Sequence, residues 1–198
     1  MKLLDYLAQK AGEQSRDFLV HDGGVKGWIS RREKRRGQFM DMLGLDPLPK
    51  RSPLRAQTLG VIQRRGYRIE RVVFQSLPGL YVRGNLYLPE GPGPFPTILY
   101  LCGHAKDGKV HYQSWGPGFA LRGFSALLVD TIEQNDGRGY HCGLKGWRNP
   151  SWISRGYTPA GVEVWNAMRA LDYLEGRPEV DAGRIGCTGL SGGGTMTW

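Results

Sequence analysis

Three strand-like segments after residue 96 constrain the fold of this chain more than any other feature. Residues 97–102 (Thr-Ile-Leu-Tyr-Leu-Cys) and 124–130 (Phe-Ser-Ala-Leu-Leu-Val-Asp) are almost entirely apolar, and residues 185–189 form a shorter strand-like segment. A strand that is apolar at consecutive positions is buried on both faces, as in a sheet that helices cover on both sides. The sequence therefore predicts an α/β fold.

Helical patterns separate these predicted strands. Residues 119–122, followed by a glycine, are typical of the end of a helix. Thr158 and Pro159 are favoured as N-cap and first helical residue, and apolar residues then recur at helical spacing until Gly176. Alternation of strands and helices predicts three parallel strands, with the helix 159–175 packed across one face of the sheet.

Two alternating segments precede the first buried strand. Residues 67–74 and 80–88 alternate between apolar and polar positions, and the turn sequence Leu-Pro-Gly at 77–79 lies between them. We expect an antiparallel hairpin over residues 67–88. The predicted architecture is thus an N-terminal antiparallel hairpin that leads into a parallel sheet covered by helices.

Positive charge is concentrated near the N-terminus. Residues 1–72 carry 16 Lys and Arg against 8 Asp and Glu, whereas residues 73–198 carry 11 against 10. A basic patch can attract nucleic acid or another polyanion. A solvated helix face is the simpler interpretation of such a charge run, so we do not expect a nucleic-acid partner.

The same region differs from the rest of the chain in its pattern. It is helical and polar, with breaks expected at Gly23-Gly24 and at Gly27, and three prolines between residues 47 and 53 mark a linker. We therefore predict a basic helical extension with a proline-rich linker, residues 1–56, and a second domain, residues 57–198.

Several classes of protein are not expected from the composition. No apolar stretch approaches the roughly 18 residues of a membrane span, and the first residues lack the apolar core of a signal peptide. We expect a cytoplasmic protein without a membrane partner. The cysteines Cys102, Cys142 and Cys187 have no metal-ligand spacing, and Cys102 and Cys187 are expected to be reduced thiols in the core. No metal and no cofactor is predicted.

A short motif carries the candidate chemistry. Residues 189–193, Gly-Leu-Ser-Gly-Gly, fit the pattern G-x-S-x-G. The motif follows a predicted strand and begins a predicted helix, which is the arrangement of a nucleophile elbow. On such a strained turn, side chains two residues before or after the serine would collide with neighbouring backbone. Ser191 is the predicted nucleophile, and an incidental serine at a glycine-rich helix start is the alternative.

Two backbone amides are candidates for an oxyanion hole. Folds with this elbow use the N–H of the residue after the nucleophile, here Gly192, and a second N–H from the loop after the first parallel strand. That loop is residues 103–109, and we assign the second donor to Ala105, with His104 as the alternative. His104 and Glu133 are candidates for the wall of the substrate pocket. A loop histidine bonded to backbone would explain His104 equally well.

The sequence lacks the usual partners of a catalytic serine. Seven residues follow Ser191, and none of them is Asp, Glu or His. The histidines all precede it: His21, His104, His111 and His141. In folds with this elbow the triad acid and histidine follow the serine, so we expect a fragment of a longer protein. A rearranged triad that uses His111 or His141 is the alternative.

Several segments in the second domain form a recognisable set. They are Asn85-Leu86-Tyr87-Leu88-Pro89, Gly103-His104, Asp107-Gly108-Lys109, residues 157–163, 169–174 and 177–181, and the elbow itself. Together they resemble the α/β-hydrolases related to acetyl xylan esterases and dienelactone hydrolases. The resemblance implies the α/β-hydrolase fold and a Ser-His-Asp hydrolase of small acyl esters, often on carbohydrate. Residues 131–136 depart from it, because relatives tend to have a Gly-Gln-Gly stretch there.

The expected function is therefore hydrolysis of carboxylic esters, with a small-molecule or carbohydrate ester as substrate. A serine peptidase of the prolyl-oligopeptidase type is the alternative enzyme, although about 60 residues of basic helix do not make a propeller. A non-catalytic fragment with a basic, polyanion-binding N-terminus is the third hypothesis. The sequence does not indicate an oligomeric state, and residues 1–198 alone are expected to be a very poor catalyst.

Overall fold

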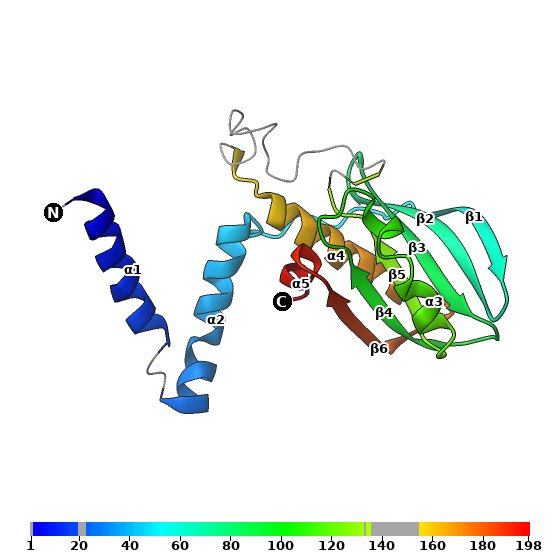
Figure 1. Cartoon of the computed structure of the whole chain (residues 1–198), viewed down its shortest axis with the longest axis horizontal. Helices are drawn as coiled ribbons and strands as arrows, with labels where there is room; N and C mark the ends of the chain where they lie inside the picture. Colours follow the sequence, from blue (N-terminus) through cyan, green and yellow to red (C-terminus); the bar gives the residue numbers. More distant parts are fainter. Residues whose placement is uncertain (1, 20–22, 133, 136–154) are drawn as a thin grey trace. The chain divides into compact units, whose positions relative to one another are not determined.

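The chain divides into two compact units, residues 1–42 and residues 43–198. The computed structural model describes residues 2–19, 23–132, 134–135 and 155–198. Figure 1 shows the helices and strands of both units.

The first unit consists of helix α1 (Leu3–Leu19) and most of helix α2 (Gly24–Leu43). The predicted break at Gly23-Gly24 is confirmed, since both glycines have positive φ angles of 62° and 66°. The predicted break at Gly27 is wrong, because α2 continues through it. A glycine inside a helix costs only about 1 kcal/mol relative to alanine and need not end the helix. No helix in the described part of the chain is long and apolar enough to cross a membrane.

The second unit is built on a six-stranded sheet with the strand order β1-β2-β3-β5-β4-β6. The strands are β1 (Gln57–Arg64), β2 (Tyr67–Leu77), β3 (Leu80–Pro89), β4 (Phe95–Leu101), β5 (Ser125–Val129) and β6 (Val180–Gly189). β2 and β3 form the predicted antiparallel hairpin, and β3 pairs antiparallel with β5. β4 pairs parallel with both β5 and β6. The predicted α/β class and strand directions are confirmed.

Strand β1 is absent from the sequence prediction. It lies at one edge of the sheet beside β2, and its apolar side chains remain largely exposed: Leu59 by 52%, Val61 by 51% and Ile62 by 36%. A strand with an exposed face has no burial pattern that would reveal it. Its register comes from pairing with β2 across the turn at Gly66, where φ is +87°.

Helices cover both faces of the sheet. They are η1 (Gly108–Val110), α3 (Trp115–Ala120), α4 (Pro159–Glu175) and α5 (Gly192–Thr197). On one face Leu99 of β4 belongs to a core cluster that includes Leu174 of α4. On the other face its neighbour Tyr100 belongs to a cluster that includes Ala120 of α3. β4 is thus buried on both sides, which explains its continuous apolar sequence.

Hydrogen bonds anchor the N-terminal half of helix α4. The Thr158 hydroxyl accepts a hydrogen bond from the Gly161 N–H at 2.9 Å, so Thr158 is the predicted N-cap. The same hydroxyl donates to the Leu43 carbonyl at 2.9 Å. Further along, the buried indole N–H of Trp165 donates to the Ser76 carbonyl at 3.0 Å. These bonds tie the first half of α4 to two other segments of the unit.

Residues 43–56 belong to the second unit, although the sequence pattern places the domain boundary near residue 56. Leu45 is 4% exposed. The Leu54 carbonyl accepts a hydrogen bond from the Gln75 N–H at 2.6 Å, and the Arg51 guanidinium lies 2.9 Å from the Asp172 carboxylate. The proline-rich segment is therefore part of the folded body that contains the sheet.

Candidate active site

Ser191 occupies a tight turn between β6 and α5. Its backbone angles are φ 56° and ψ −121°, which non-glycine residues rarely adopt. Holding a residue in such a region costs about 1–3 kcal/mol, and strain of this kind concentrates at functional sites. The strand–turn–helix context that the motif requires is therefore present at Ser191.

Close backbone contacts explain the glycines on both sides of the turn. A Cβ atom on Gly189 would overlap the backbone of Gly193 and lie 2.6 Å from the Leu101 carbonyl oxygen. A Cβ atom on Gly193 would overlap that same carbonyl. Since the ends of β4 and β6 approach so closely, only glycine fits two residues before and two residues after Ser191.

The loop after β4 lies against this turn. A Cβ atom on Gly103 would overlap the Leu190 carbonyl oxygen and lie 3.2 Å from the Cβ atom of Ser191. The loop that the sequence predicts as the source of the second oxyanion donor is therefore adjacent to the candidate nucleophile.

The imidazole of His104 covers the residue after Ser191. A Cβ atom on Gly192 would overlap the Cε1 and Nδ1 atoms of His104 and lie 3.3 Å from its Nε2 atom. That Nε2 atom lies 3.1 Å from Oε1 of Glu163, whose side chain is only 3% exposed. Glu163 is not among the predicted site residues. A helical glutamate is normally exposed to solvent, so its residue type gives no signal of this role.

The amide of Ala105 is engaged within its own loop. Its N–H donates to the Gly103 carbonyl at 2.8 Å. An oxyanion would have to compete with that carbonyl for the Ala105 N–H. Gly192, in contrast, is the first residue of α5, and an N–H at this position has no acceptor within the helix.

A buried polar network ties the loop after β4 to the loop after β5. Oδ1 of Asp130 accepts hydrogen bonds from the Lys109 backbone N–H and from the Asn135 side-chain amide, both at 2.8 Å. The Lys109 ammonium donates to the other oxygen of Asp130. The Gln134 side-chain amide donates to the Gly103 carbonyl at 2.6 Å. The network therefore fixes Gly103, which is in contact with the Ser191 turn.

The predicted residues do not all fall in the described part of the chain. Glu133, predicted for the pocket wall, and His141, an alternative base, lie outside the described residues. His111 lies at the end of η1, and its ring packs edge-on against Tyr112 with centroids 4.9 Å apart. The structure brings Ser191, Gly192 and His104 together, whereas the N–H of Ala105, in the same loop as His104, is bonded to the Gly103 carbonyl.

The two described cysteines do not compete with Ser191 as nucleophiles. Both are free thiols. Burial, with a further contribution from the Asp130 charge, raises the pKa of Cys102 to about 12, and burial of its thiol also raises the pKa of Cys187. Cys102 is buried, as predicted. Cys187, also predicted for the core, is an exposed residue on β6, although its sulfur lies 3.7 Å from the Thr197 hydroxyl and is partly covered. The described residues contain no cluster of three His, Cys, Asp or Glu that could hold a metal ion.

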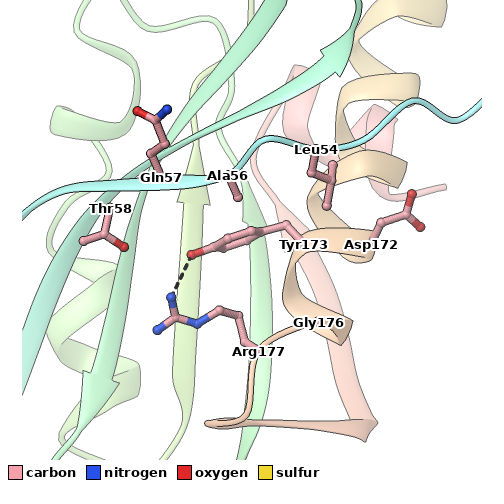
Figure 2. Close-up of a pocket in the computed structure, with 8 residues that line it drawn as sticks. All are labelled: Leu54, Ala56, Gln57, Thr58, Asp172, Tyr173, Gly176 and Arg177. Carbon is pink, nitrogen blue, oxygen red and sulfur yellow. Dashed lines mark hydrogen bonds between the residues drawn. The ribbon is translucent and has the colours of Figure 1, made fainter.

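A separate pocket of about 250 Å³ lies at the opposite end of α4 (Figure 2). Its lining residues are Leu54, Ala56, Gln57, Thr58, Asp172, Tyr173, Gly176 and Arg177. The Arg177 guanidinium donates to the Tyr173 hydroxyl at 3.3 Å and to the carboxylates of Glu70 and Glu179, both at 2.9 Å. Burial alone would raise the pKa of Glu179, but hydrogen bonds and the Arg177 charge hold it below its usual range. The charges at this pocket are therefore paired.

Comparison with known proteins gives matches over most of the second unit. A family model described as acetyl xylan esterase (AXE1) matches residues 57–198. The protein YtaP of Bacillus subtilis (strain 168) is 26% identical over 184 residues, which cover 84% of this chain and 58% of YtaP. The mitochondrial acyl-coenzyme A thioesterase 2 of Rattus norvegicus is 30% identical over 118 residues, which cover 58% of this chain and 21% of that protein.

The solved structure of an acetyl xylan esterase also matches. The acetyl xylan esterase from Paenibacillus sp. R4 superposes with a TM-score of 0.60 at 25% identity. The match covers 82% of this chain and 52% of that chain. The present chain thus spans little more than half the length of YtaP and of the Paenibacillus protein.

Proposed function

Because the chain belongs to the acetyl xylan esterase family, we propose that it carries the nucleophile of a serine ester hydrolase and that this nucleophile is Ser191. The observation that supports the assignment most directly is the strained backbone of Ser191 at the end of β6, with the loop after β4 against it. A strained turn of this kind exposes the serine hydroxyl at the C-terminal ends of the strands, where substrate binds.

The oxyanion of the tetrahedral intermediate would be held by backbone amides. The N–H of Gly192 is one donor. For the second we favour the N–H of His104 over that of Ala105, since the Ala105 N–H already donates to Gly103. Donors that are fixed before the reaction stabilise the charge that develops on the carbonyl oxygen, and one such donor accounts for about 10²–10³ in turnover.

In the proposed reaction, the Ser191 hydroxyl attacks the ester carbonyl carbon and its proton passes to a general base. Collapse of the intermediate breaks the bond to the alcohol, which leaves with a proton, and an acyl-serine remains. Water then attacks the acyl-serine and releases the acid. In folds with this elbow the triad histidine follows the nucleophile in the chain, and His104 precedes Ser191, so we do not assign His104 as the base. We propose instead that the triad acid and histidine lie outside residues 1–198.

The proposed substrates are small acyl esters, with acetyl groups on carbohydrate as the first choice. The family match and the likeness to the Paenibacillus acetyl xylan esterase support this choice. Thioesters are a second candidate, because the rat acyl-coenzyme A thioesterase is 30% identical over 118 residues. Both classes of substrate would use the same nucleophile and oxyanion hole.

The test is turnover by the product of the whole reading frame on p-nitrophenyl acetate, acetylated xylan and acetyl-coenzyme A. We expect Ser191→Ala to lose about 10⁴–10⁶-fold in turnover, because the nucleophile is gone. Ser114→Ala is the matched control, since Ser114 is exposed and makes no capping hydrogen bond with its side chain. Full activity in Ser191→Ala would rule out the proposal, and the ratio of rates on the three substrates decides between ester and thioester.

Residues 1–198 by themselves should hydrolyse p-nitrophenyl acetate near the background rate. A serine hydroxyl without a base is a weak nucleophile at neutral pH. The measurement compares this polypeptide with the product of the whole reading frame at equal concentration. Robust turnover that depends on Ser191 in the short polypeptide would show that one of its own histidines acts as the base.

A further inference from the structure

Glu163 links the first turns of α4 to the candidate site. Its side chain is 3% exposed, and its Oε1 atom lies 3.1 Å from Nε2 of His104. The two residues are 59 positions apart in the sequence. The helix that carries Glu163 is capped a few residues earlier by Thr158, whose hydroxyl also bonds to Leu43. Glu163 therefore extends from a fixed turn to a residue of the loop after β4.

The carboxylate of Glu163 determines how the ring of His104 is oriented. Nε2 of His104 and Oε1 of Glu163 share a hydrogen bond; with an ionised carboxylate, which only accepts, Nε2–H is the donor. The adjacent Cε1–Nδ1 edge of the ring faces Gly192, where a Cβ atom would overlap both atoms. The imidazole is thus held between a buried carboxylate and the backbone of the residue after Ser191.

We propose that the Glu163–His104 pair is a positioning device for the oxyanion hole. The inference rests on the proposed function, in which the two donors are the N–H groups of His104 and Gly192. Glu163 holds the first donor residue by its side chain, and the ring of that residue packs on the second. Glu163 itself does not touch substrate, so it is a positioning residue and not a catalytic one.

The position of these donors matters because an oxyanion hole depends on distance. Donors are effective at about 2.7–3.1 Å from the position that the oxyanion will occupy. A displacement of about 1 Å can lower a rate by about 100-fold. Loss of the Glu163 carboxylate removes the hydrogen bond to Nε2, so the ring that packs against Gly192 is held less firmly and the spacing of the two donors is less well fixed.

The test uses the product of the whole reading frame with Glu163→Ala and Glu163→Gln. Active sites are counted with a fluorophosphonate that labels Ser191, and kcat and KM are measured on p-nitrophenyl acetate. A trifluoromethyl ketone serves as a mimic of the tetrahedral oxyanion. We expect Glu163→Ala to lower kcat per labelled site by about 10–100-fold with little change in KM, and to weaken ketone binding by the same factor. Glu163→Gln should keep most of the activity, because its amide oxygen can accept the same hydrogen bond.

A purely structural role for Glu163 would give a different result. The amount of labelled protein would then fall in Glu163→Ala, while kcat and ketone affinity per labelled site stay within about twofold of the original, and this overturns the inference. Where Glu163→Ala does not fold, Glu163→Asp keeps the charge but shortens the reach by one methylene, and an unchanged kcat in that variant overturns the inference equally. Failure of Ser191 to label, or full activity in Ser191→Ala, would instead reject the proposed function.

Discussion

The two backbone segments that meet at the candidate site are held in place by different means. The turn after β6 is held by close backbone contact: glycines at 189 and 193 lie against the Leu101 carbonyl with no room for a Cβ atom. The loop after β4 is held by side chains, because Asp130, Gln134 and Glu163 each bond to it from other elements. Adding side-chain atoms should therefore disrupt the turn, whereas removing side-chain atoms should disrupt the loop.

The largest effect is expected from adding one methyl group at the turn. In Gly193→Ala the new Cβ atom would overlap the Leu101 carbonyl, so the free energy of unfolding should fall by about 4 kcal/mol and turnover should be lost. Gly194→Ala is the matched control, since its Cβ atom would lie 3.5 Å from the Gly189 carbonyl oxygen, an ordinary contact. For both variants, urea unfolding measures the stability and p-nitrophenyl acetate hydrolysis measures the turnover. Equal stability of the two variants would contradict the backbone account of the turn.

Removing the carboxylate of Asp130 should damage the loop after β4. The Lys109 ammonium, whose side chain is 13% exposed, would lose its partner. Removing one member of a buried ion pair costs about 3 kcal/mol, so Asp130→Ala should destabilise the protein by about that amount and lower turnover. Asp181→Ala is the control, because its partner Arg184 is exposed and such surface pairs contribute little. Both variants are unfolded with urea. If the free energy of unfolding falls no more in Asp130→Ala than in Asp181→Ala, the network does not hold the loop.

A smaller effect is expected at Gln134. Its side chain donates to the Gly103 carbonyl at 2.6 Å and accepts from the Thr131 N–H at 3.0 Å. Gln134→Ala should cost about 1–2 kcal/mol in the free energy of unfolding and should reduce kcat, because Gly103 touches the Ser191 turn. The exposed Gln113 provides the control, as Gln113→Ala. An unchanged kcat in Gln134→Ala would mean that the loop keeps its position without this bond.

The smallest effect is expected at Glu179, remote from both segments, and it depends on pH. The pKa of Glu179 is held below its ordinary value by hydrogen bonds and by Arg177, against the effect of burial. The ionised form is thus favoured in the folded protein, so its contribution to stability is full above the ordinary pKa and is lost as pH falls through the lowered one. The difference in melting temperature between the original protein and Glu179→Gln should therefore be larger at neutral pH than in acid. A difference in melting temperature that stays the same at every pH would argue against a lowered pKa of Glu179. Turnover per folded molecule should not change in Glu179→Gln.

Features that bury side chains were predictable from the sequence. β4 shows its burial as a continuous apolar run, because alternate residues face cores that contain α4 and α3. The N-cap at Thr158 and the turn at Ser191 were predictable because few residue types satisfy those backbone conformations. β1 has neither kind of signal, since its apolar side chains face solvent and its order comes from pairing with β2.

The sequence by itself determined the α/β class, the strand directions and the position of Ser191, because periodicity and glycine placement are local consequences of burial and backbone geometry. Only the tertiary structure decided what surrounds that serine. It joined Glu163 to His104 across 59 positions, turned the Ala105 N–H toward Gly103, and made residues 43–56 part of the second unit. Such contacts depend on which helix and which loop meet in space. A single glutamate or alanine in the sequence carries no record of its distant partner.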